Sequence, residues 1–236
     1  MKRLGIIGAM SSEVDNLIQR MEDTTITEYA GRRFVCGRLA GQDAVVVQSG
    51  IGKVAAAITA QMLVDRFGVT ALVNTGMAGG LDRRLAVKDL VVATGAIQHD
   101  FDLTAFGHVR GYLTGEDDQK PTVFACDPTL VEKALVAAQG VLPQGSKAIT
   151  GTVASGDIFV DDSGLKASLR DDFGAAAAEM EGAAIAQAAA ANGIPFVILR
   201  TISDLAEQEA TVSFDEMERY AGQLAGDITT ALCQTL

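Results

Sequence analysis

The sequence predicts one α/β domain over residues 1–236, with three layers (α/β/α) around a mixed, largely parallel central sheet. Short apolar runs alternate with helical patterns along the whole chain, which is typical of this fold class. No linker, repeat or low-complexity segment divides the 236 residues, and α/β folds of this length commonly form one core. Hydrophobic residues make up 48% of the chain and charged residues 21%, which is a globular composition.

Each element follows from a local pattern. Apolar runs predict strands at residues 4–8, 25–29, 33–39, 44–48, 70–74, 90–96, 148–153 and 196–202. Capping residues and helical periodicity predict helices from Ser11 or Ser12 to about 21, at 53–67, 128–138, 163–171 and 181–192, and from Phe214 onward. Residues 40–43 read as a hairpin turn, and residues 98–120 read as a long functional loop.

The charge balance excludes several classes of partner. The formal net charge is −11, so DNA, RNA and acidic membrane surfaces would be repelled, and no basic stripe offsets this charge. The apolar run at the start ends at Met10, and no segment of membrane length follows it. We therefore expect neither a nucleic-acid partner nor a membrane partner.

Cysteine and histidine usage points to the cytoplasm and away from metals. Cys36, Cys126 and Cys233 are odd in number and widely spaced, which argues against a disulfide framework and suits a reducing compartment. His99 and His108 are the only histidines, so a histidine-rich metal site is poorly supplied. We expect no metal and no cofactor, and direct catalysis by either histidine is not favoured.

Two polar clusters interrupt segments that otherwise read as buried. Glu179-Met180-Glu181 stands between small apolar residues, and Arg200-Thr201-Ile202-Ser203-Asp204 ends an apolar run. A charge buried without partners costs several kcal/mol or more, so we take both clusters, as carboxylate-bearing strand ends, to mark a site. Glu179 reads equally well as a structural partner of a cation or of backbone donors.

Two glycine-rich turns add weaker signals. Gly50-Ile51-Gly52-Lys53-Val54-Ala55 matches a dinucleotide-binding pattern, but the next strand ends in Asn74-Thr75-Gly76 rather than in an acidic residue. A tight strand–helix turn is the better interpretation, and an NAD oxidoreductase is a distant alternative. Asn74 to Gly80 follows a strand at the edge where ligands collect in α/β sheets.

Seven motifs together carry a family resemblance. They span nearly the whole chain, from about residue 3 to 220, and read Gly8-Ala9-Met10-Ser11-Ser12-Glu13-Val14, Ser49-Gly50-Ile51-Gly52-Lys53-Val54-Ala55-Ala56, Asn74-Thr75-Gly76-Met77-Ala78-Gly79-Gly80, Thr104-Ala105-Phe106-Gly107, Ser155-Gly156-Asp157-Ile158-Phe159, Glu179-Met180-Glu181 and Arg200-Thr201-Ile202-Ser203-Asp204. In this order they closely resemble bacterial 5′-methylthioadenosine/S-adenosylhomocysteine nucleosidases of the nucleoside phosphorylase-like superfamily. The resemblance implies hydrolysis of the N-glycosidic bond of these nucleosides, with release of adenine and the 5-thio-substituted ribose.

The resemblance also implies residue roles. Asp204 matches the general acid that protonates adenine N7, and Ser203 would hold its carboxyl group. Glu181 matches the carboxylate that binds the ribose hydroxyls, with Met180 packing on the sugar. The segment around Phe159 and Val160 resembles the part that reads adenine, with the Phe159 ring on the base.

Further positions are implied around this centre. Phe214 would line the site, and Phe106 would reach the alkylthio pocket of a neighbouring subunit, because the family is typically homodimeric. The remaining substrate-binding candidates come from the first and third motifs and from the turn between them, namely Met10, Ile51, Met77, Ala78 and Gly79.

Glu13 favours a hydrolase over a phosphorylase. A phosphate cradle needs cations or free N–H groups, whereas the turn after the first strand has no Arg or Lys and carries this carboxylate. We expect Glu13 to orient and deprotonate a water, with Arg200 as its neighbour. Taken alone, Glu13 would read as an acidic residue that complements a helix dipole.

One position departs from the family pattern and leaves turnover and substrate preference open. Many members have Ser where this chain has Met77, which cannot donate a hydrogen bond, so water placement would rest on Glu13 and Arg200. Two alternatives remain: a nucleosidase or phosphorylase for 5′-deoxyadenosine, aminodeoxyfutalosine or a purine nucleoside, and a non-catalytic sensor of adenosine ligands.

Overall fold

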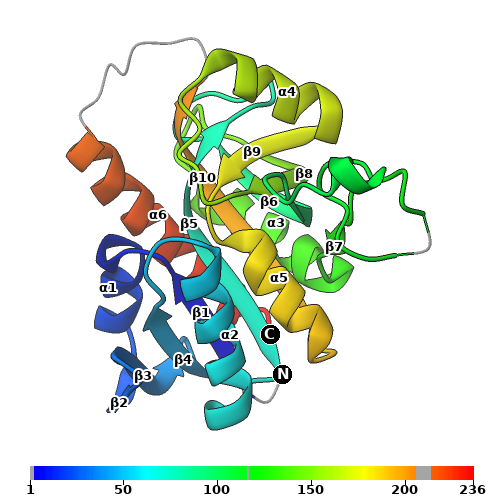
Figure 1. The fold of residues 1–236 in the computed structure, drawn as a ribbon. Helices are drawn as coiled ribbons and strands as arrows, with labels where there is room; N and C mark the ends of the chain where they lie inside the picture. Colours follow the sequence, from blue (N-terminus) through cyan, green and yellow to red (C-terminus); the bar gives the residue numbers. More distant parts are fainter. Residues whose placement is uncertain (1–2, 116, 206–213) are drawn as a thin grey trace.

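The computed structural model describes residues 3–115, 117–205 and 214–236 and has a mixed sheet with helices against it (Figure 1). The strands are β1 Leu4–Gly8, β2 Glu22–Tyr29, β3 Arg32–Leu39, β4 Gln42–Gln48, β5 Ala71–Gly80, β6 Leu90–Gln98, β7 Phe124–Ala125, β8 Ala148–Ser155, β9 Ala175–Glu179 and β10 Phe196–Leu205. The helices are α1 Ser11–Gln19, α2 Lys53–Phe67, α3 Pro128–Val141, α4 Ser163–Phe173, α5 Gly182–Ala191 and α6 Phe214–Cys233, with a short 3-10 helix at Thr104–Phe106.

The sheet is partly closed on itself. Strands β5, β1, β4, β3 and β2 lie side by side in that order, while β10, β6, β8, β9 and β5 follow one another along a second path. Because β10 also pairs with β5, this second path closes into a ring. Within the described residues, five strand pairings are parallel and five are antiparallel. The α/β class and the mixed sheet are confirmed, whereas the predicted excess of parallel pairing is not found.

Helices cover both faces of β1. A Cβ built on Gly5 would point at Leu63 of α2, whereas one built on Gly8 would point at Val14 of α1. Residues three apart in a strand face opposite sides, so α1 and α2 lie on opposite faces. Helix α1 packs against α6, and α2 packs against α5 (Figure 1).

The main difference from the sequence prediction lies at the carboxyl ends of the strands. We expected β5 to stop at Asn74 and β10 at Ile202, yet they run to Gly80 and Leu205. Gly76 and Gly79 pair with Arg200 and Asp204 in the parallel ladder, so the glycine-rich segment is strand rather than turn. The strand–turn rule failed here because the missing side chains leave room for this close pairing.

Smaller corrections concern turns and short elements. The hairpin turn is only Ala40-Gly41, both with positive φ of 50° and 85°, since Gln42 and Asp43 already belong to β4. Helix α1 ends at Gln19 instead of residue 21. The short strand β7 was not predicted, and no bounds were predicted for β9.

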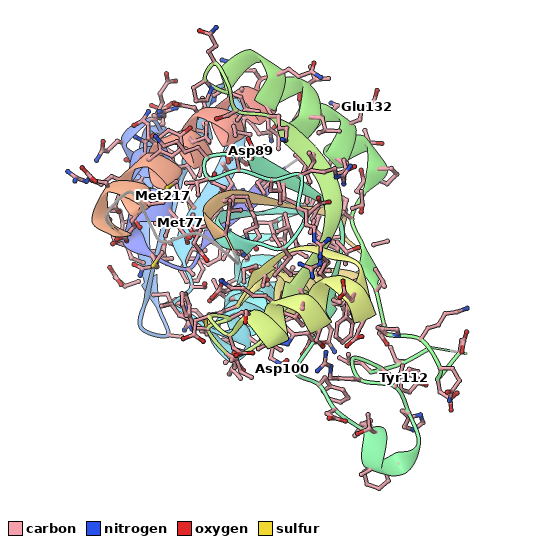
Figure 2. All side chains as sticks on the ribbon, turned by 90° about the horizontal axis from the view of Figure 1, so that it is seen from above. Met77, Asp89, Asp100, Tyr112, Glu132 and Met217 are labelled. Carbon is pink, nitrogen blue, oxygen red and sulfur yellow. The ribbon has the colours of Figure 1, made fainter. Side chains whose placement is uncertain are left out.

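The segment between β6 and β7 projects from the rest of the molecule, with Tyr112 on it (Figure 2). The long loop predicted there is confirmed for the described residues, apart from the 3-10 turn. None of the helices in the described ranges is long and apolar enough to span a bilayer.

Candidate functional site

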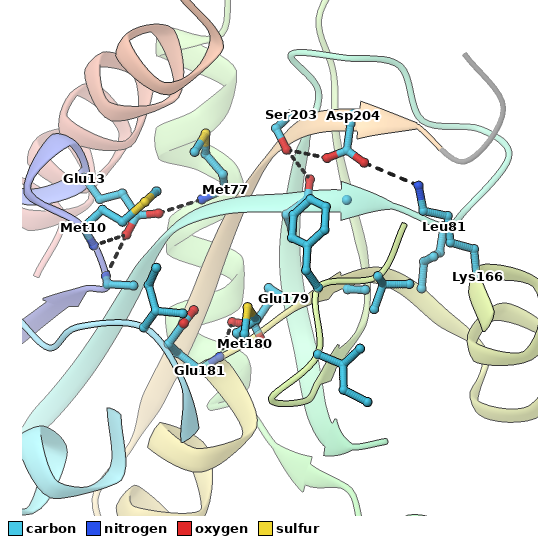
Figure 3. Close-up of a pocket in the computed structure, with 18 residues that line it drawn as sticks. Met10, Glu13, Met77, Leu81, Lys166, Glu179, Met180, Glu181, Ser203 and Asp204 are labelled. Atoms are coloured by element: carbon cyan, nitrogen blue, oxygen red, sulfur yellow. Dashed lines mark hydrogen bonds and ion pairs between the residues drawn. The ribbon is translucent and has the colours of Figure 1, made fainter. Parts of the chain in front are cut away.

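A cavity of about 190 Å³ opens where β1, β5, β9 and β10 end. The predicted site residues that line it are Met10, Glu13, Ile51, Met77, Ala78, Gly79, Phe159, Val160, Met180, Glu181, Ser203 and Asp204. Figure 3 shows Glu13 and Asp204 at opposite ends of the cavity. The ends of these four strands therefore bring together predicted site residues that are up to 194 positions apart in the sequence, from Met10 to Asp204.

Two of the predicted residues that the structure describes do not line this cavity. Arg200 lies behind its wall with 1% of its surface exposed. Phe106 is 78% exposed in the 3-10 helix, so its expected contact with a neighbouring subunit stays a prediction. The side chain of Phe214 lies outside the described residues. Neither His99 nor His108 lines the cavity.

Glu13 is a buried carboxylate held by main-chain donors. One oxygen, Oε2, accepts from the N–H groups of Ala9 at 2.6 Å and Met10 at 3.1 Å, and Oε1 accepts from Met77 N–H at 3.1 Å. Burial raises the pKa of Glu13 above its usual 4.5, although the charge of Arg200 and the three N–H groups lower it. A fixed carboxylate with a raised pKa is a suitable general base.

Arg200 lies behind the same wall of the cavity and contacts the residues that form it. Its Nη2 donates to Asn74 Oδ1 at 2.6 Å and to Glu179, and it lies 3.6 Å from Glu181 Oε2. No direct hydrogen bond joins Arg200 to Glu13. Arg200 therefore acts on Glu13 through its charge and on Glu179 through direct contact.

Gly76 is the position that lets Glu13 and Arg200 approach each other. A Cβ there would overlap both Glu13 Oε1 and Arg200 Nη1. We expect Gly76→Ala to displace this pair, to lower kcat/KM by at least about 10-fold and to cost about 1–3 kcal/mol of stability, the usual range for overpacking. Gly140→Ala is the control, because a Cβ at Gly140 meets no atom within 4 Å. Equal catalytic rates and melting temperatures for the two variants would refute this account.

Glu179 is fully occupied by structural contacts. Its carboxylate accepts from Arg200, from the Ser155 hydroxyl, from Glu181 N–H at 3.0 Å and from Gly182 N–H at 2.8 Å. The two main-chain N–H donors lie at the start of α5, where the helix dipole also favours an anion. Of the two interpretations of Glu179, the structural partner is the one that its contacts support.

Glu181 lines the cavity, and its Oε2 lies in an ion pair with Arg200 but accepts no hydrogen bond from the described residues. Its Oε1 accepts from Gly52 N–H at 3.0 Å, which ties the glycine-rich turn before α2 to the start of α5. Burial, and then the charge of Glu179, raise the pKa of Glu181 from 4.5 to about 7, while Arg200 lowers it. This carboxylate can accept hydrogen bonds from hydroxyl groups of a ligand.

Asp204 stands at the other end of the cavity and is one-third exposed. Its Oδ1 accepts from the Ser203 hydroxyl at 2.7 Å. Its Oδ2 lies 3.6 Å from Nζ of Lys166 in α4. Lys166 also lines the cavity, and it was not among the site residues predicted from the sequence.

A signal for Lys166 was present in the sequence. Lys166 shares the buried stripe of α4 with Leu169, and its side chain is only 7% exposed. A lysine on the apolar face of an amphipathic helix is rare without a charged partner or a function. Of the other lining residues outside the predicted site, Ala9, Leu81, Ile158 and Ala178 are apolar and carry no such signal, and Glu179 is the residue whose role the sequence left open.

A polar network fixes the segment that carries Phe159. Asp157 N–H donates to Asp100 Oδ2 at 2.9 Å, and Asp157 Oδ1 accepts from Lys53 N–H at 2.8 Å. Lys53 Nζ in turn lies 2.6 Å from Asp100 Oδ1. The network positions Phe159, which is 68% exposed, over the cavity edge.

Comparison with known proteins gives the family. The family model of the phosphorylase superfamily matches residues 3–234, almost the full chain. The chain belongs to the phosphorylase superfamily. Its relatives within this superfamily include a 5′-methylthioadenosine/S-adenosylhomocysteine nucleosidase of Shewanella frigidimarina, 42% identical over 99% of this chain and 100% of the relative.

Solved structures of the phosphorylase superfamily agree. A 5′-methylthioadenosine/S-adenosylhomocysteine nucleosidase from Colwellia psychrerythraea, in complex with adenine, superposes with a TM-score of 0.91 and 42% identity over 100% of this chain and 96% of that one. A futalosine hydrolase from Helicobacter pylori superposes with a TM-score of 0.90 and 31% identity over the whole of both chains. The fold and family implied by the sequence motifs are thereby confirmed.

Proposed function

We propose that this chain hydrolyses the N-glycosidic bond of 5′-methylthioadenosine and S-adenosylhomocysteine, without a cofactor. The observation that carries the proposal is the pair of carboxylates at opposite ends of one cavity, Glu13 and Asp204. The relatives named above support the substrate, since one is a nucleosidase for these compounds and another binds adenine.

Each carboxylate has its own part in the reaction. Asp204 gives its proton to N7 of adenine, the C1′–N9 bond breaks, and the electron pair of that bond leaves with the base. Positive charge develops on the ribose, where Glu181 accepts from the sugar hydroxyls and stabilises the charge. Water then bonds to C1′ and gives a proton to Glu13.

Water, rather than phosphate, suits the end of the cavity at Glu13. The carboxylate already uses the N–H groups of Ala9, Met10 and Met77, and phosphate would need such groups free. Met77 offers no side-chain donor, and Arg200 does not line the cavity. Water placement therefore falls to Glu13.

Incubation of the purified chain with 5′-methylthioadenosine, S-adenosylhomocysteine and 5′-deoxyadenosine tests the proposal. Release of free adenine is expected from the first two. Tight binding without cleavage, together with an Asp204→Asn variant that behaves like wild type, would favour the sensor instead. Aminodeoxyfutalosine belongs in the same assay, because the futalosine hydrolase structure is the one named relative with a different substrate.

We also propose that the chain is a homodimer. Ile51, Val54 and Ile58 expose 60%, 69% and 44% of their surfaces beside the cavity or along α2, and Phe159 is exposed nearby. Apolar side chains that gather in this way are typical of interfaces. We expect Val54→Glu to shift the sedimentation of the protein from dimer to monomer, whereas the same change at Val136, which is also exposed (57%) but lies in α3, should leave it unchanged. A monomeric wild type would contradict the proposal.

The cytoplasmic location stays a prediction from the free cysteines Cys36, Cys126 and Cys233.

A further inference from the structure

Lys166 places a cation at the end of the cavity where the general acid stands. Its Nζ lies 3.6 Å from Asp204 Oδ2, and its side chain is 93% buried (7% exposed) yet lines the cavity. Helix α4 sets it there: Asp162 caps the helix by accepting from Leu165 N–H at 2.7 Å, and Lys166 then shares the inward face with Leu169. No hydrogen bond occupies Nζ among the described residues.

The edge of a purine that carries N7 also carries the substituent at C6. In adenine this edge offers an acceptor at N7 and a donor at the 6-amino group, whereas a 6-oxopurine offers two acceptors, N7 and O6. Protonated Asp204 alone fits adenine, because its O–H donates to N7 and its second oxygen accepts from the amino group. A 6-oxopurine needs two donors, which Asp204 alone does not provide.

Lys166 supplies the missing donor. An ammonium group has three N–H donors and no acceptor, and its four-carbon stem is flexible. From 3.6 Å away it can approach the group that lies beside N7 without displacing Asp204. We propose that Lys166 makes 6-oxopurine nucleosides, with hypoxanthine in place of adenine, additional substrates of this site.

The inference rests on the proposed hydrolase function and uses the same steps. The C1′–N9 bond breaks with its electron pair going to hypoxanthine, N7 takes the proton of Asp204, and water adds to C1′ while Glu13 takes its proton. Lys166 exchanges no proton in these steps and donates only a hydrogen bond to O6. It is therefore a specificity-determining residue that contacts the base.

The test compares two substrates that differ only at C6, 5′-methylthioadenosine and 5′-methylthioinosine. We expect wild type to release hypoxanthine from the second. Lys166→Met keeps the apolar stem and removes the donors, so kcat/KM for the 6-oxo substrate should fall about 10-fold or more relative to the 6-amino substrate, as for the loss of one charge-assisted hydrogen bond. Lys166→Arg keeps a donor and should retain more of the 6-oxo activity. Lys147→Met, which removes an exposed lysine paired with Asp89, should change neither rate.

The outcomes separate this inference from the function on which it rests. Adenine release without hypoxanthine release by wild type overturns the role of Lys166 and leaves the nucleosidase proposal standing. Equal losses on both substrates in Lys166→Met also overturn it, because they would mean that Lys166 only supports Asp204. Release of neither base overturns both proposals. If Lys166→Met does not fold, the wild-type rates and Lys166→Arg still decide.

Discussion

Replacing Asp204 by Asn is expected to lower kcat/KM for adenine release by about 10³-fold, within the usual ~10²–10⁴-fold range for a general acid. The Asn amide can still accept from the Ser203 hydroxyl, so the side chain keeps its place. It has no acidic proton for N7, however, and the leaving group must depart as an anion. Initial rates of adenine release measure the effect.

Two controls sharpen this result. Ser203→Ala removes the 2.7 Å hydrogen bond to Oδ1, together with a longer one of 3.3 Å to the Ala78 carbonyl oxygen, and should cost about 10-fold, as for the loss of a polar contact. Because Asp204 is one-third exposed, the melting temperature of Asp204→Asn should stay close to that of wild type. A variant that is well folded and retains more than about a third of the wild-type rate would remove Asp204 from the mechanism.

Replacing Glu13 by Gln should lower kcat/KM by about 10²–10⁴-fold, since the base that takes the proton of water is lost. The Gln amide has one acceptor oxygen for three N–H donors, so we also expect a loss of about 1–3 kcal/mol in stability. Rates must therefore be compared well below the melting temperature. Asp15→Asn is the matched control, because it removes an exposed acid from the same helix without touching the cavity. If Asp15→Asn caused a similar loss, Glu13 would act only through the dipole of α1.

The pH dependence of kcat/KM gives a second test of the role of Glu13 as the base. The base must be ionised, and burial raises the pKa of Glu13 above 4.5. Through Glu13, the wild-type kcat/KM should thus be lost as the pH falls through this raised pKa. Burial raises the pKa of Glu181 to about 7, and this group contributes in the same direction, because only its ionised form stabilises the ribosyl cation. A rate that stays constant down to pH 4.5 would contradict both roles.

The sequence predicted the individual strands and helices better than the pairing that closes part of the sheet into a ring. Alternating patterns gave β1 and α2 with their observed bounds, because their apolar runs end at clear turn residues. The ring of strands was not predictable, since pairing between β10 and β5 depends on contacts between residues more than 120 positions apart. Local rules also treat Gly76 and Gly79 as strand breakers, whereas their missing side chains are what allow the pairing.

The site was predictable where several motifs agreed, and not where a single residue stood alone. Glu13, Glu181 and Asp204 lie in motifs that resemble a family, and the fold brings all three to one cavity. The supporting role of Glu179 was not predictable from the sequence, because it depends on the contacts of its oxygens with Arg200 and with Gly182 N–H in the folded chain. Lys166 belongs to no motif, and its functional assignment rests on its distance to Asp204.

The most direct test of the central claim is the product formed from 5′-methylthioadenosine with and without phosphate. We expect the same rate of adenine release in phosphate-free buffer and in buffer with millimolar phosphate, with free 5-methylthioribose as the only sugar product by mass spectrometry. A rate that requires phosphate, with 5-methylthioribose 1-phosphate as the product, would contradict the assignment of Glu13 as the base that activates water.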